Sequence, residues 1–313
     1  MQQLDSREVA SRLDRSALID ALDAAFRTSY TAPERQQYSL PSATDQGART
    51  LLVMPAWRED GTAGVKVVTV FADNARRRLP AVHASYLLLD GTTGETRAIL
   101  DGSELTLWRT GAASALAARH LSRPDASRLL MVGAGRLAPH LIESHRLVRP
   151  IREVRVWGRR HEAAQALAAA LDRDGLDVTA TEDLRESVQW ADIVSCATLS
   201  GSPLVLGTWL RPGQHLDLVG SFTPAMREVD DAALLRSEIY VDSRRGALAE
   251  SGELLGAIAR GAIRADAIRA ELSELASGRF RRSSEQAITT FKSVGVAIED
   301  LVAAQMVVER APR

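Results

Sequence analysis

The feature that most constrains the fold is a glycine-rich turn that joins an apolar strand to a helix. The strand is the run Leu129–Val132, and the turn after it reads Gly133-Ala134-Gly135-Arg136-Leu137-Ala138. In a Gly-x-Gly-x-x-Ala turn the first glycine permits the tight turn, the second lets the backbone approach a pyrophosphate, and the small alanine permits close helix–strand contact. The helix N-terminus also favours a phosphate. The pattern predicts a dinucleotide-binding turn, with a purely structural glycine turn as the alternative.

Strand and helix patterns alternate from residue 127 onwards. Helical stretches lie between most of the strands, notably at 137–148 and 162–172. Repeated strand–helix units indicate a parallel sheet with helices on both of its faces. The expected strands are 128–132, 153–157, 177–180, 193–197, 215–219 and 238–241.

The chain before residue 121 has a different pattern. Helical spacing predicts helices at 5–30 and 103–121, and a last amphipathic helix is expected at 293–308. Short β-branched or aliphatic runs between the first two helices indicate a mostly antiparallel sheet. These runs are 50–54, 64–71, 84–89 and 96–100. The predicted fold class is therefore α/β, with a Rossmann-type doubly wound parallel sheet and a second α+β part.

The end of the second strand of the alternating series bears on the choice of cofactor. An NAD site usually carries an acid there that binds the ribose 2′-hydroxyl. This chain has Gly158-Arg159-Arg160-His161 instead, and the first carboxylate is Glu162. Two arginines suit a 2′-phosphate, so the sequence favours NADP(H) and leaves NAD(H) possible. The alternative is that both arginines are solvated surface charges.

Composition excludes several classes of protein. The 313 residues suggest two domains. A formal net charge of -1 gives no support to a nucleic-acid groove, and the single cysteine, Cys196, excludes an internal disulfide or a four-cysteine zinc site. We expect no metal site from the histidine spacing. The chain start has no secretory pattern and no apolar run is long enough for a membrane span, so we expect a soluble, cytoplasmic protein.

Three basic residues outside the glycine-rich turn are candidates for holding a substrate. Lys66 lies within an apolar strand, where a lysine must snorkel, form an ion pair or have a shifted pKa. Arg49 precedes the strand at 50–54, and Arg109 stands before the small residues 110–114, which would let another group approach. Arginine binds a carboxylate through two parallel hydrogen bonds. A structural ion pair is the alternative for each of the three.

Short motifs of defined order and spacing run along nearly the whole chain. Together they resemble the ornithine cyclodeaminase/μ-crystallin family. The motifs are Val53-Met54-Pro55, Gly64-Val65-Lys66, Leu79-Pro80, Arg109-Thr110-Gly111-Ala112-Ala113-Ser114, Val132-Gly133-Ala134-Gly135, Ala191-Asp192-Ile193-Val194, Val219-Gly220-Ser221, Arg227-Glu228-Val229-Asp230, Tyr240-Val241-Asp242-Ser243, Glu250-Ser251-Gly252 and Phe291-Lys292-Ser293-Val294-Gly295.

The resemblance implies a domain division and a set of site residues. Residues 121–292 would form the dinucleotide-binding domain, and 1–120 with 293–313 would form a substrate-binding domain that pairs two chains into a homodimer. Arg49 and Lys66 would hold the substrate carboxylate, and Arg109 would lie near both this carboxylate and the nicotinamide. The further cofactor-binding residues would be Thr110, Gly133, Ala134, Gly135, Leu137, Gly158, Arg159, Arg160, Thr198, Val219 and Ser293.

One position departs from the ornithine cyclodeaminases of this family. Those enzymes carry an aspartate in a Val-Gly-Gly-Asp-x-Pro segment, where it handles proton transfers. This chain reads Val219-Gly220-Ser221-Phe222-Thr223-Pro224, and Phe222 cannot accept a proton. The resemblance is therefore closer to the μ-crystallin branch, which includes ketimine reductases. Glu250 is the remaining acid candidate nearby, with a structural salt bridge as its alternative.

The sequence thus predicts an NAD(P)H-dependent oxidoreductase. It would reduce the C=N bond of an imino acid or cyclic imine, or oxidise the matching amino acid. Lys66 is the expected proton donor, with Glu250 or water as the alternative. Two other functions stay open: cyclisation of ornithine to proline with release of ammonia, and non-enzymatic binding of a small ligand.

Overall fold

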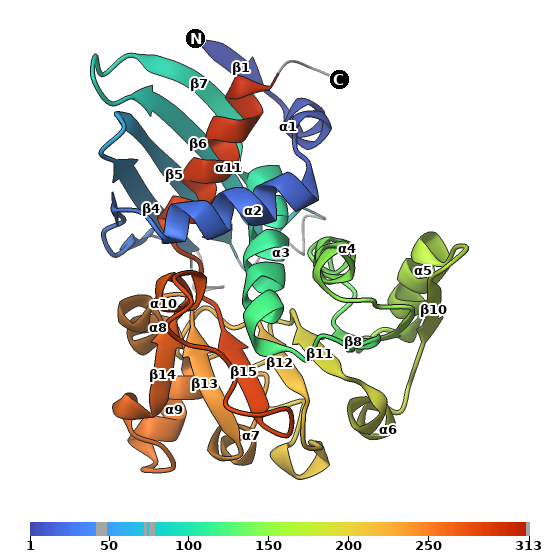
Figure 1. Cartoon of the computed structure of the whole chain (residues 1–313). Helices are drawn as coiled ribbons and strands as arrows, with labels where there is room; N and C mark the ends of the chain where they lie inside the picture. The colour runs from blue at the N-terminus through green and yellow to red at the C-terminus, as the bar shows by residue number, and fades with distance from the viewer. Residues whose placement is uncertain (42–48, 72–73, 75–78, 311–313) are drawn as a thin grey trace. The chain divides into compact units, whose positions relative to one another are not determined.

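The computed structural model describes residues 1–41, 49–71, 74 and 79–310, and the chain divides into two compact units (Figure 1). Unit 1 comprises Met1–Arg109 and Val296–Arg313, and unit 2 comprises Thr110–Gly295. The sequence placed the boundaries near residues 120 and 293. Within the described part of the chain, no helix has the length and apolar character that crossing a membrane requires.

Unit 1 is built on a seven-stranded sheet of order β1-β7-β6-β5-β4-β2, with β3 paired to β4. All strand pairs in it are antiparallel except β1 with β7. Buried and less buried side chains alternate along the long strands, as expected for a sheet with one covered face. The strands are β1 (Gln2–Leu4), β2 (Tyr30–Thr31), β3 (Gln36–Ser39), β4 (Arg49–Arg58), β5 (Thr62–Phe71), β6 (Val82–Asp90) and β7 (Thr96–Asp101).

The covered face of this sheet contacts α11 (Ala297–Glu309), which lies against β4, β5 and β6 and also contacts α2 (Arg15–Phe26) (Figure 1). The helical pattern predicted for residues 5–30 forms two helices, α1 (Ser6–Arg12) and then α2. The side chain of Asp14 accepts from the Ala17 amide and begins the second helix. Helix α3 (Gly102–Leu121) begins within unit 1 and ends within unit 2.

Unit 2 contains an eight-stranded sheet in which every strand pair is parallel, in the order β10-β9-β8-β11-β12-β15-β13-β14. From β8 the chain continues to β9 and β10 on one side of the sheet. It then returns to β11, on the other side of β8, and continues to β12. Parallel neighbours of this kind require crossover connections, which are usually helices. The strands are β8 (Arg128–Val132), β9 (Glu153–Trp157), β10 (Asp177–Ala180), β11 (Ile193–Cys196), β12 (His215–Leu218), β13 (Ser237–Val241), β14 (Ile268–Glu271) and β15 (Ile288–Lys292).

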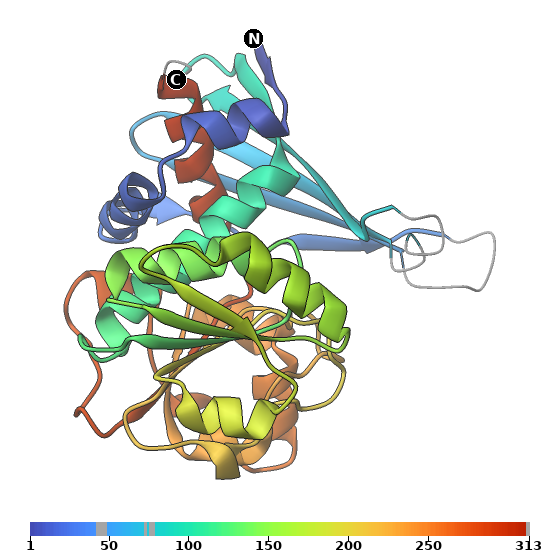
Figure 2. The ribbon, with the colours of Figure 1, turned by 90° about the vertical axis from the view of Figure 1, so that its right-hand side faces the viewer.

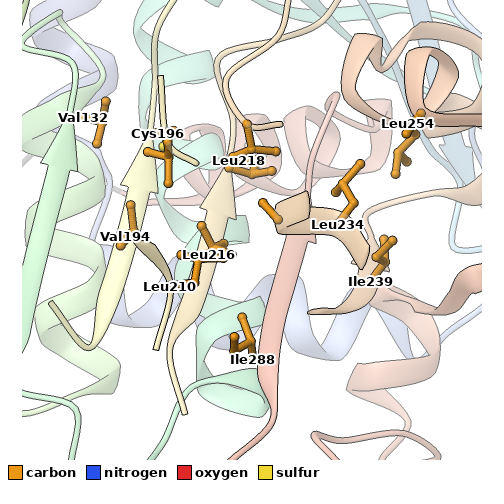
Figure 3. Packing of buried hydrophobic residues seen from close by; sticks show 14 of the residues in the cluster. Val132, Val194, Cys196, Leu210, Leu216, Leu218, Leu234, Ile239, Leu254 and Ile288 are labelled. Atoms are coloured by element: carbon orange, nitrogen blue, oxygen red, sulfur yellow. The ribbon is translucent and has the colours of Figure 1, made fainter. Parts of the chain in front are cut away.

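Helices cover both faces of the unit 2 sheet (Figure 2). On one face Leu129 and Met131 of β8 pack with residues of α4 and α5; on the other, Leu130 and Val132 join the cluster drawn in Figure 3. This burial explains why β8 reads as a continuous apolar run. The helices are α4 (Ala138–Val148), α5 (His161–Leu171), α6 (Leu184–Trp190), α7 (Asp231–Leu235), α8 (Arg244–Glu250), α9 (Gly252–Ala259) and α10 (Leu272–Ala276), with short 3-10 turns η2 (Gly207–Trp209) and η3 (Ala265–Ala267).

The predicted fold class is confirmed, and two sequence expectations need correction. The last helix begins at Ala297 rather than at residue 293, because the amides of Val294 and Gly295 bind the Asp242 carboxylate and Gly295 has φ 91°. The sequence pattern also missed strands β14 and β15. β15 lies between β12 and β13, so its neighbours come from distant parts of the sequence.

Candidate functional site

The glycine-rich turn lies at the carboxyl end of β8, where the strand order of unit 2 reverses between β8 and β11. Gly133 has φ 119°, and a Cβ atom at this position would lie 2.6 Å from the carbonyl oxygen of Ala197, at the end of β11. The two strand ends therefore approach each other at a place that only glycine allows. Ligands of open α/β sheets bind at such a reversal of strand order.

The remainder of the turn fits a pyrophosphate group. A Cβ atom on Gly135 would meet nothing within 4 Å, so space remains beside this part of the backbone. Helix α4 starts directly after the turn, and no side chain caps its N-terminus at Leu137. Amides at the start of a helix attract anions. Ala134 lies within the turn and is the neighbour of Gly158, whose Cβ would lie 3.5 Å from the Ala134 side chain.

The carboxyl end of β9 carries the two arginines that the sequence assigned to the cofactor. Arg159 and Arg160 are both exposed, and Arg160 stands at the N-cap of α5. Because β9 is the neighbour of β8, these side chains belong to the same edge of the sheet as the glycine-rich turn.

Thr198 and Val219, two further predicted cofactor residues, follow the adjacent strands β11 and β12. A buried carboxylate joins the two segments. Glu228 accepts from the amide and hydroxyl of Thr198, at 2.6 and 2.8 Å, and from the amide of Gly220 at 2.9 Å. Gly220 packs tightly here, since a Cβ atom would lie 2.1 Å from the Thr198 carbonyl oxygen. Glu228 therefore fixes the strand ends that frame the predicted nicotinamide region.

Glu228 belongs to a fully buried cluster of charges that the sequence did not predict. The Glu228 amide donates to Glu253, whose carboxylate also accepts from the Ser221 hydroxyl. Lys292 lies 3.9 Å from Glu253 and donates to the carbonyl oxygens of Leu218 and Ser221. Burial raises the pKa of Glu228 to about 7; the nearby charge of Lys292 opposes this and that of Glu253 adds to it. The cluster holds the loop after β12 from several sides.

Ser293, another predicted cofactor residue, follows β15 and is held at the same edge. Its amide donates to the Leu218 carbonyl oxygen at 3.1 Å. Asp242, at the end of β13, binds the next two amides, those of Val294 and Gly295, at 2.8 and 2.6 Å. Thr110 is buried in α3, next to Gly111, where a Cβ atom would lie 2.8 Å from the carbonyl oxygen of His140 in α4.

Glu250, the acid nominated from the sequence, is the last residue of α8 and is half-buried. The following Gly252 packs on the segment after Phe222, since its Cβ atom would lie 1.9 Å from the Met226 carbonyl oxygen. Phe222 is itself half-buried. The buried acid Glu253 bonds to this segment, through the Ser221 hydroxyl and the Glu228 amide.

Unit 1 holds the second group of predicted site residues. Lys66 on β5 and Arg109 on α3 share one carboxylate oxygen, because Asp300 Oδ1 accepts from Lys66 Nζ at 2.8 Å and from Arg109 Nε at 3.2 Å. Arg109 also donates to Glu299 at 2.6 Å. All four side chains are buried, Lys66 with 2% of its surface exposed. The structure therefore brings Lys66 and Arg109 together on two neighbouring acids of α11.

The surroundings of Lys66 change its basicity. Burial and the charge of Arg109 lower the pKa of Lys66 to about 8, against the opposite effect of Asp300; the charge of Arg35 also lowers it. Thr106 on α3 accepts from Lys66 at 3.2 Å. A lysine with such a pKa exchanges its proton near neutral pH, which suits acid–base chemistry.

Arg49 is placed elsewhere. It pairs with Phe71 at the far end of β4 and β5 and stacks on that ring at 5.4 Å, whereas Lys66 pairs with Met54. Arg49 and Met54 are five positions apart on β4, a distance of about 17 Å along the strand. Because five is an odd number, their side chains point to opposite faces of the sheet, and Lys66 shares the face of Met54. The structure therefore does not bring Arg49 to Lys66. Besides Arg109, the charge of Arg35 also acts on Lys66, and the sequence reasoning missed Arg35.

The other missed residues had a signal in the sequence. Glu228, Asp242 and Lys292 each stand within a motif that the family resemblance already singled out. Asp300 and Glu299 are acids on the apolar face of the last helix, and a buried acid needs a partner. What the sequence lacked was the pairing, because Lys66 and Asp300 are 234 residues apart.

The fold and these two clusters define a dinucleotide-binding α/β protein with a second, sheet-based unit. The chain belongs to the ornithine cyclodeaminase/mu-crystallin family, since a sequence model of that family matches residues 2–313. This confirms the predicted resemblance.

Individual relatives cover nearly the whole chain. Delta(1)-pyrroline-2-carboxylate reductase of Paracoccus denitrificans is 42% identical over 290 residues, which are 92% of this chain and 91% of the relative. Ketimine reductase mu-crystallin of Rattus norvegicus is 35% identical over 312 residues, 97% of this chain and 95% of the relative. The solved structure of Thermococcus litoralis Delta(1)-pyrroline-2-carboxylate reductase in complex with NADH and L-proline has a TM-score of 0.94 at 32% identity and covers 99% of this chain and 97% of that chain.

Proposed function

We propose that this chain is a nicotinamide-dependent reductase of a cyclic imino acid, with Δ1-pyrroline-2-carboxylate as the first candidate substrate. The observation that carries the proposal is the buried lysine of unit 1, which shares the Asp300 carboxylate with Arg109. The names of the two reductases at 42% and 35% identity support the reaction class. The glycine-rich turn of unit 2 supplies the expected cofactor site.

The positive charges of unit 1 would receive the substrate carboxylate. Asp300 and Glu299 balance the charges of Lys66 and Arg109, and Arg35 adds a further positive charge that acts on Lys66, so an anion bound here is favoured electrostatically. We assign carboxylate binding to Arg109 and Arg35. Arg49, which stacks on Phe71, stays a candidate through the family resemblance. A fixed carboxylate leaves the imine carbon and nitrogen in one orientation, which lowers the entropic part of the barrier.

Lys66 would control the proton of the imine nitrogen. The bound cofactor supplies a hydride, and a protonated iminium accepts a hydride more readily than a neutral imine. Because burial lowers the pKa of Lys66 to about 8, its ammonium can give up a proton near neutral pH. The imine nitrogen takes this proton, and solvent returns one to the lysine. Glu250 is the alternative donor and would be tested by Glu250→Gln.

The cofactor we propose is NADP(H), with NAD(H) as the less favoured choice. Arg159 and Arg160 are exposed at the end of β9, where a 2′-phosphate would be bound. The open space beside Gly135 and the uncapped N-terminus of α4 fit the pyrophosphate. Thr198, Val219 and Ser293 would lie along the nicotinamide half, on strand ends held by Glu228, Lys292 and Asp242.

We also propose that the chain forms a homodimer through the sheet of unit 1. One face of this sheet packs on α11, and the other carries apolar side chains of β4, β5 and β6 that are half-buried or exposed, among them Trp57 at 44% and Val67 at 40% exposure. A contiguous apolar sheet face of this kind marks an interaction surface.

Turnover of purified protein tests the proposal. NADPH and NADH oxidation is followed with Δ1-pyrroline-2-carboxylate and other cyclic and linear imines, and ammonia release is followed with ornithine. We expect imine reduction and no ammonia release, because Phe222 cannot handle protons. Lys66→Met should remove turnover and leave cofactor affinity nearly unchanged, since Arg109 still pairs with Asp300. Robust cyclisation of ornithine, or cofactor binding without any turnover, would contradict the proposal.

A further inference from the structure

Asp300 is the one residue of α11 that contacts both site cations of unit 1. Its Oδ1 atom accepts from Lys66 Nζ at 2.8 Å and from Arg109 Nε at 3.2 Å. Within the described residues, the adjacent Glu299 contacts Arg109 but not Lys66. Asp300 and Glu299 have no exposed surface. The two neighbouring carboxylates thus have different partners, and of the two it is the Asp300 carboxylate that connects Lys66 to Arg109.

We propose that Asp300 is the positioning residue of the reaction: by holding Lys66 and Arg109 on one carboxylate oxygen, it fixes the proton donor relative to the guanidinium that binds the substrate carboxylate. This inference rests on the proposed function, in which Lys66 protonates the imine nitrogen. Asp300 acts through Lys66 and Arg109 and needs no contact with the substrate.

The hydrogen bonds around Lys66 leave one direction for the transferred proton. Thr106 donates its hydroxyl proton to the Gly102 carbonyl oxygen at 2.7 Å, so its oxygen is turned to accept from Lys66 at 3.2 Å. An ammonium has three N–H groups. Asp300 and Thr106 accept two of these N–H groups, and the third would donate to the imine nitrogen. A flexible lysine side chain would otherwise lose this orientation.

The charge of Asp300 also decides when Lys66 carries its proton. Within the described residues, four titratable or charged groups face Lys66: Arg109 from α3, Asp300 from α11, Arg35, and Tyr86 from the neighbouring strand β6. Glu299 lies behind Arg109. Burial raises the pKa of Tyr86 well above its ordinary value, so this phenol stays neutral. Among these groups, Asp300 is the carboxylate that touches the ammonium and stabilises it.

Asp300→Asn is a near-isosteric test. Asp300 Oδ2 is buried and has no hydrogen-bond partner within the described residues, so the amide nitrogen can take its place without facing another donor. The Asn oxygen can then keep both hydrogen bonds and lose only the charge. Glu299→Gln removes the second charge that pairs with Arg109, and Glu309→Gln removes an exposed acid from the same helix.

The chain offers a direct way to observe the Lys66 proton. It contains only two lysines, Lys66 and Lys292. Protein labelled with ¹³C at the lysine side chains therefore gives two sets of signals, and Lys66→Met assigns them. The titration of Lys66 is measured in the wild type and in the three carboxylate variants. In parallel, the pH profile of kcat is measured with Δ1-pyrroline-2-carboxylate and NADPH.

In Asp300→Asn we expect the Lys66 titration to move to lower pH by about 1 to 3 units, because the ammonium loses its anionic partner. The alkaline fall of kcat should move with it. Glu299→Gln should raise KM and leave the Lys66 titration in place, and Glu309→Gln should change neither. An unmoved Lys66 titration in Asp300→Asn, or a kcat profile that does not follow it, would overturn the inference.

A second variant covers the case in which Asp300→Asn does not fold. Asp300→Glu keeps the charge but displaces the oxygen by one methylene, so the Lys66 titration should stay within about 1 unit of the wild type while kcat falls by about 10-fold or more. Wild-type kcat in Asp300→Glu would contradict the positioning role. If the wild type reduces no imine, the proposed function fails, while the Lys66 titration in the variants still decides whether Asp300 controls the lysine.

Discussion

Glu228 accepts three hydrogen bonds from two separate strand ends, although its side chain is completely buried. Burial of a carboxylate is unfavourable unless donors replace water around it. Thr198 and Gly220 provide those donors, and in return Glu228 holds both segments in place. Asp300 in unit 1 is likewise a buried carboxylate with several donors, since its Oδ1 atom accepts from both Lys66 and Arg109. In both places a single acid fixes the geometry of residues that would contact ligands.

The pKa of Glu228 predicts a pH dependence of stability. Its folded-state pKa, raised by burial from 4.5 to about 7, lies above the unfolded value. Between these pH values the folded chain therefore binds a proton that the unfolded chain has released, so this group lowers the free energy of unfolding as the pH rises through the window. Glu228→Gln should remove that contribution. It should also cost about 1–3 kcal/mol at every pH, because one amide of Thr198 or Gly220 loses its acceptor.

Urea unfolding from pH 4.5 to 8 measures this effect. The wild type should lose more stability across the window than Glu228→Gln does. Glu182→Gln, which alters an exposed acid of the same unit, should retain the slope of the wild type. Parallel curves for the wild type and Glu228→Gln would show that Glu228 does not titrate in this range.

The β8–α4 turn shows at the level of elements how two glycines of one motif differ. Gly133 has φ 119° and faces the Ala197 carbonyl oxygen, whereas Gly135 faces open space. Gly133→Ala should therefore lower the free energy of unfolding by more than about 1 kcal/mol, through strain and the clash with the neighbouring strand end. Gly135→Ala should fold with wild-type stability and bind NADPH about 10-fold more weakly, because the new methyl group occupies the space left for the pyrophosphate.

Thermal unfolding and fluorescence titration with NADPH separate the two effects. The pair is its own control, since both changes add one methyl group two residues apart. Unchanged NADPH affinity in Gly135→Ala would place the pyrophosphate away from this turn.

The β9–α5 connection should decide cofactor choice. Replacement of both Arg159 and Arg160 by alanine should weaken NADPH by about 10- to 100-fold, which corresponds to losing charge-assisted hydrogen bonds to a 2′-phosphate. NADH, which lacks that phosphate, should bind almost as before. Dissociation constants for both cofactors test this, with the exposed Arg185→Ala on α6 as the matched control. Tighter binding of NADH than NADPH by the wild type would refute the proposed preference.

At the scale of the whole molecule, the outward face of the unit 1 sheet predicts assembly. Light scattering at micromolar concentration should give the mass of a dimer. Val67→Glu places a charge on the central strand of that face, where the side chain is already 40% exposed, so a monomer tolerates it while a sheet-to-sheet interface does not. Leu147→Glu, at a 51% exposed apolar position on α4, should leave the dimer intact. A monomeric wild type would contradict the proposed homodimer.

The amino-acid sequence was enough to predict the parallel sheet of unit 2, the glycine-rich turn and the position of Lys66 within an apolar strand. These follow from local properties: an apolar run that must be covered on both faces, a backbone conformation that favours glycine, and a lysine between valines. Phe222 and the arginines after β9 were equally visible, because a residue type alone limits the chemistry it can perform.

Which charges meet depends on the packing of the folded chain. Strand β15 lies between β12 and β13, so Lys292 reaches the carbonyl oxygens of Leu218 and Ser221 more than 70 residues away. Asp300 pairs with Lys66 and Arg109, Arg49 stacks on Phe71, and the charge of Arg35 also acts on Lys66. Sequence spacing carries no information on such contacts, because they depend on strand order and on the register of β4 against β5. A buried charge needs a partner of opposite sign or several dipoles, and only the packed chain shows which residue provides it.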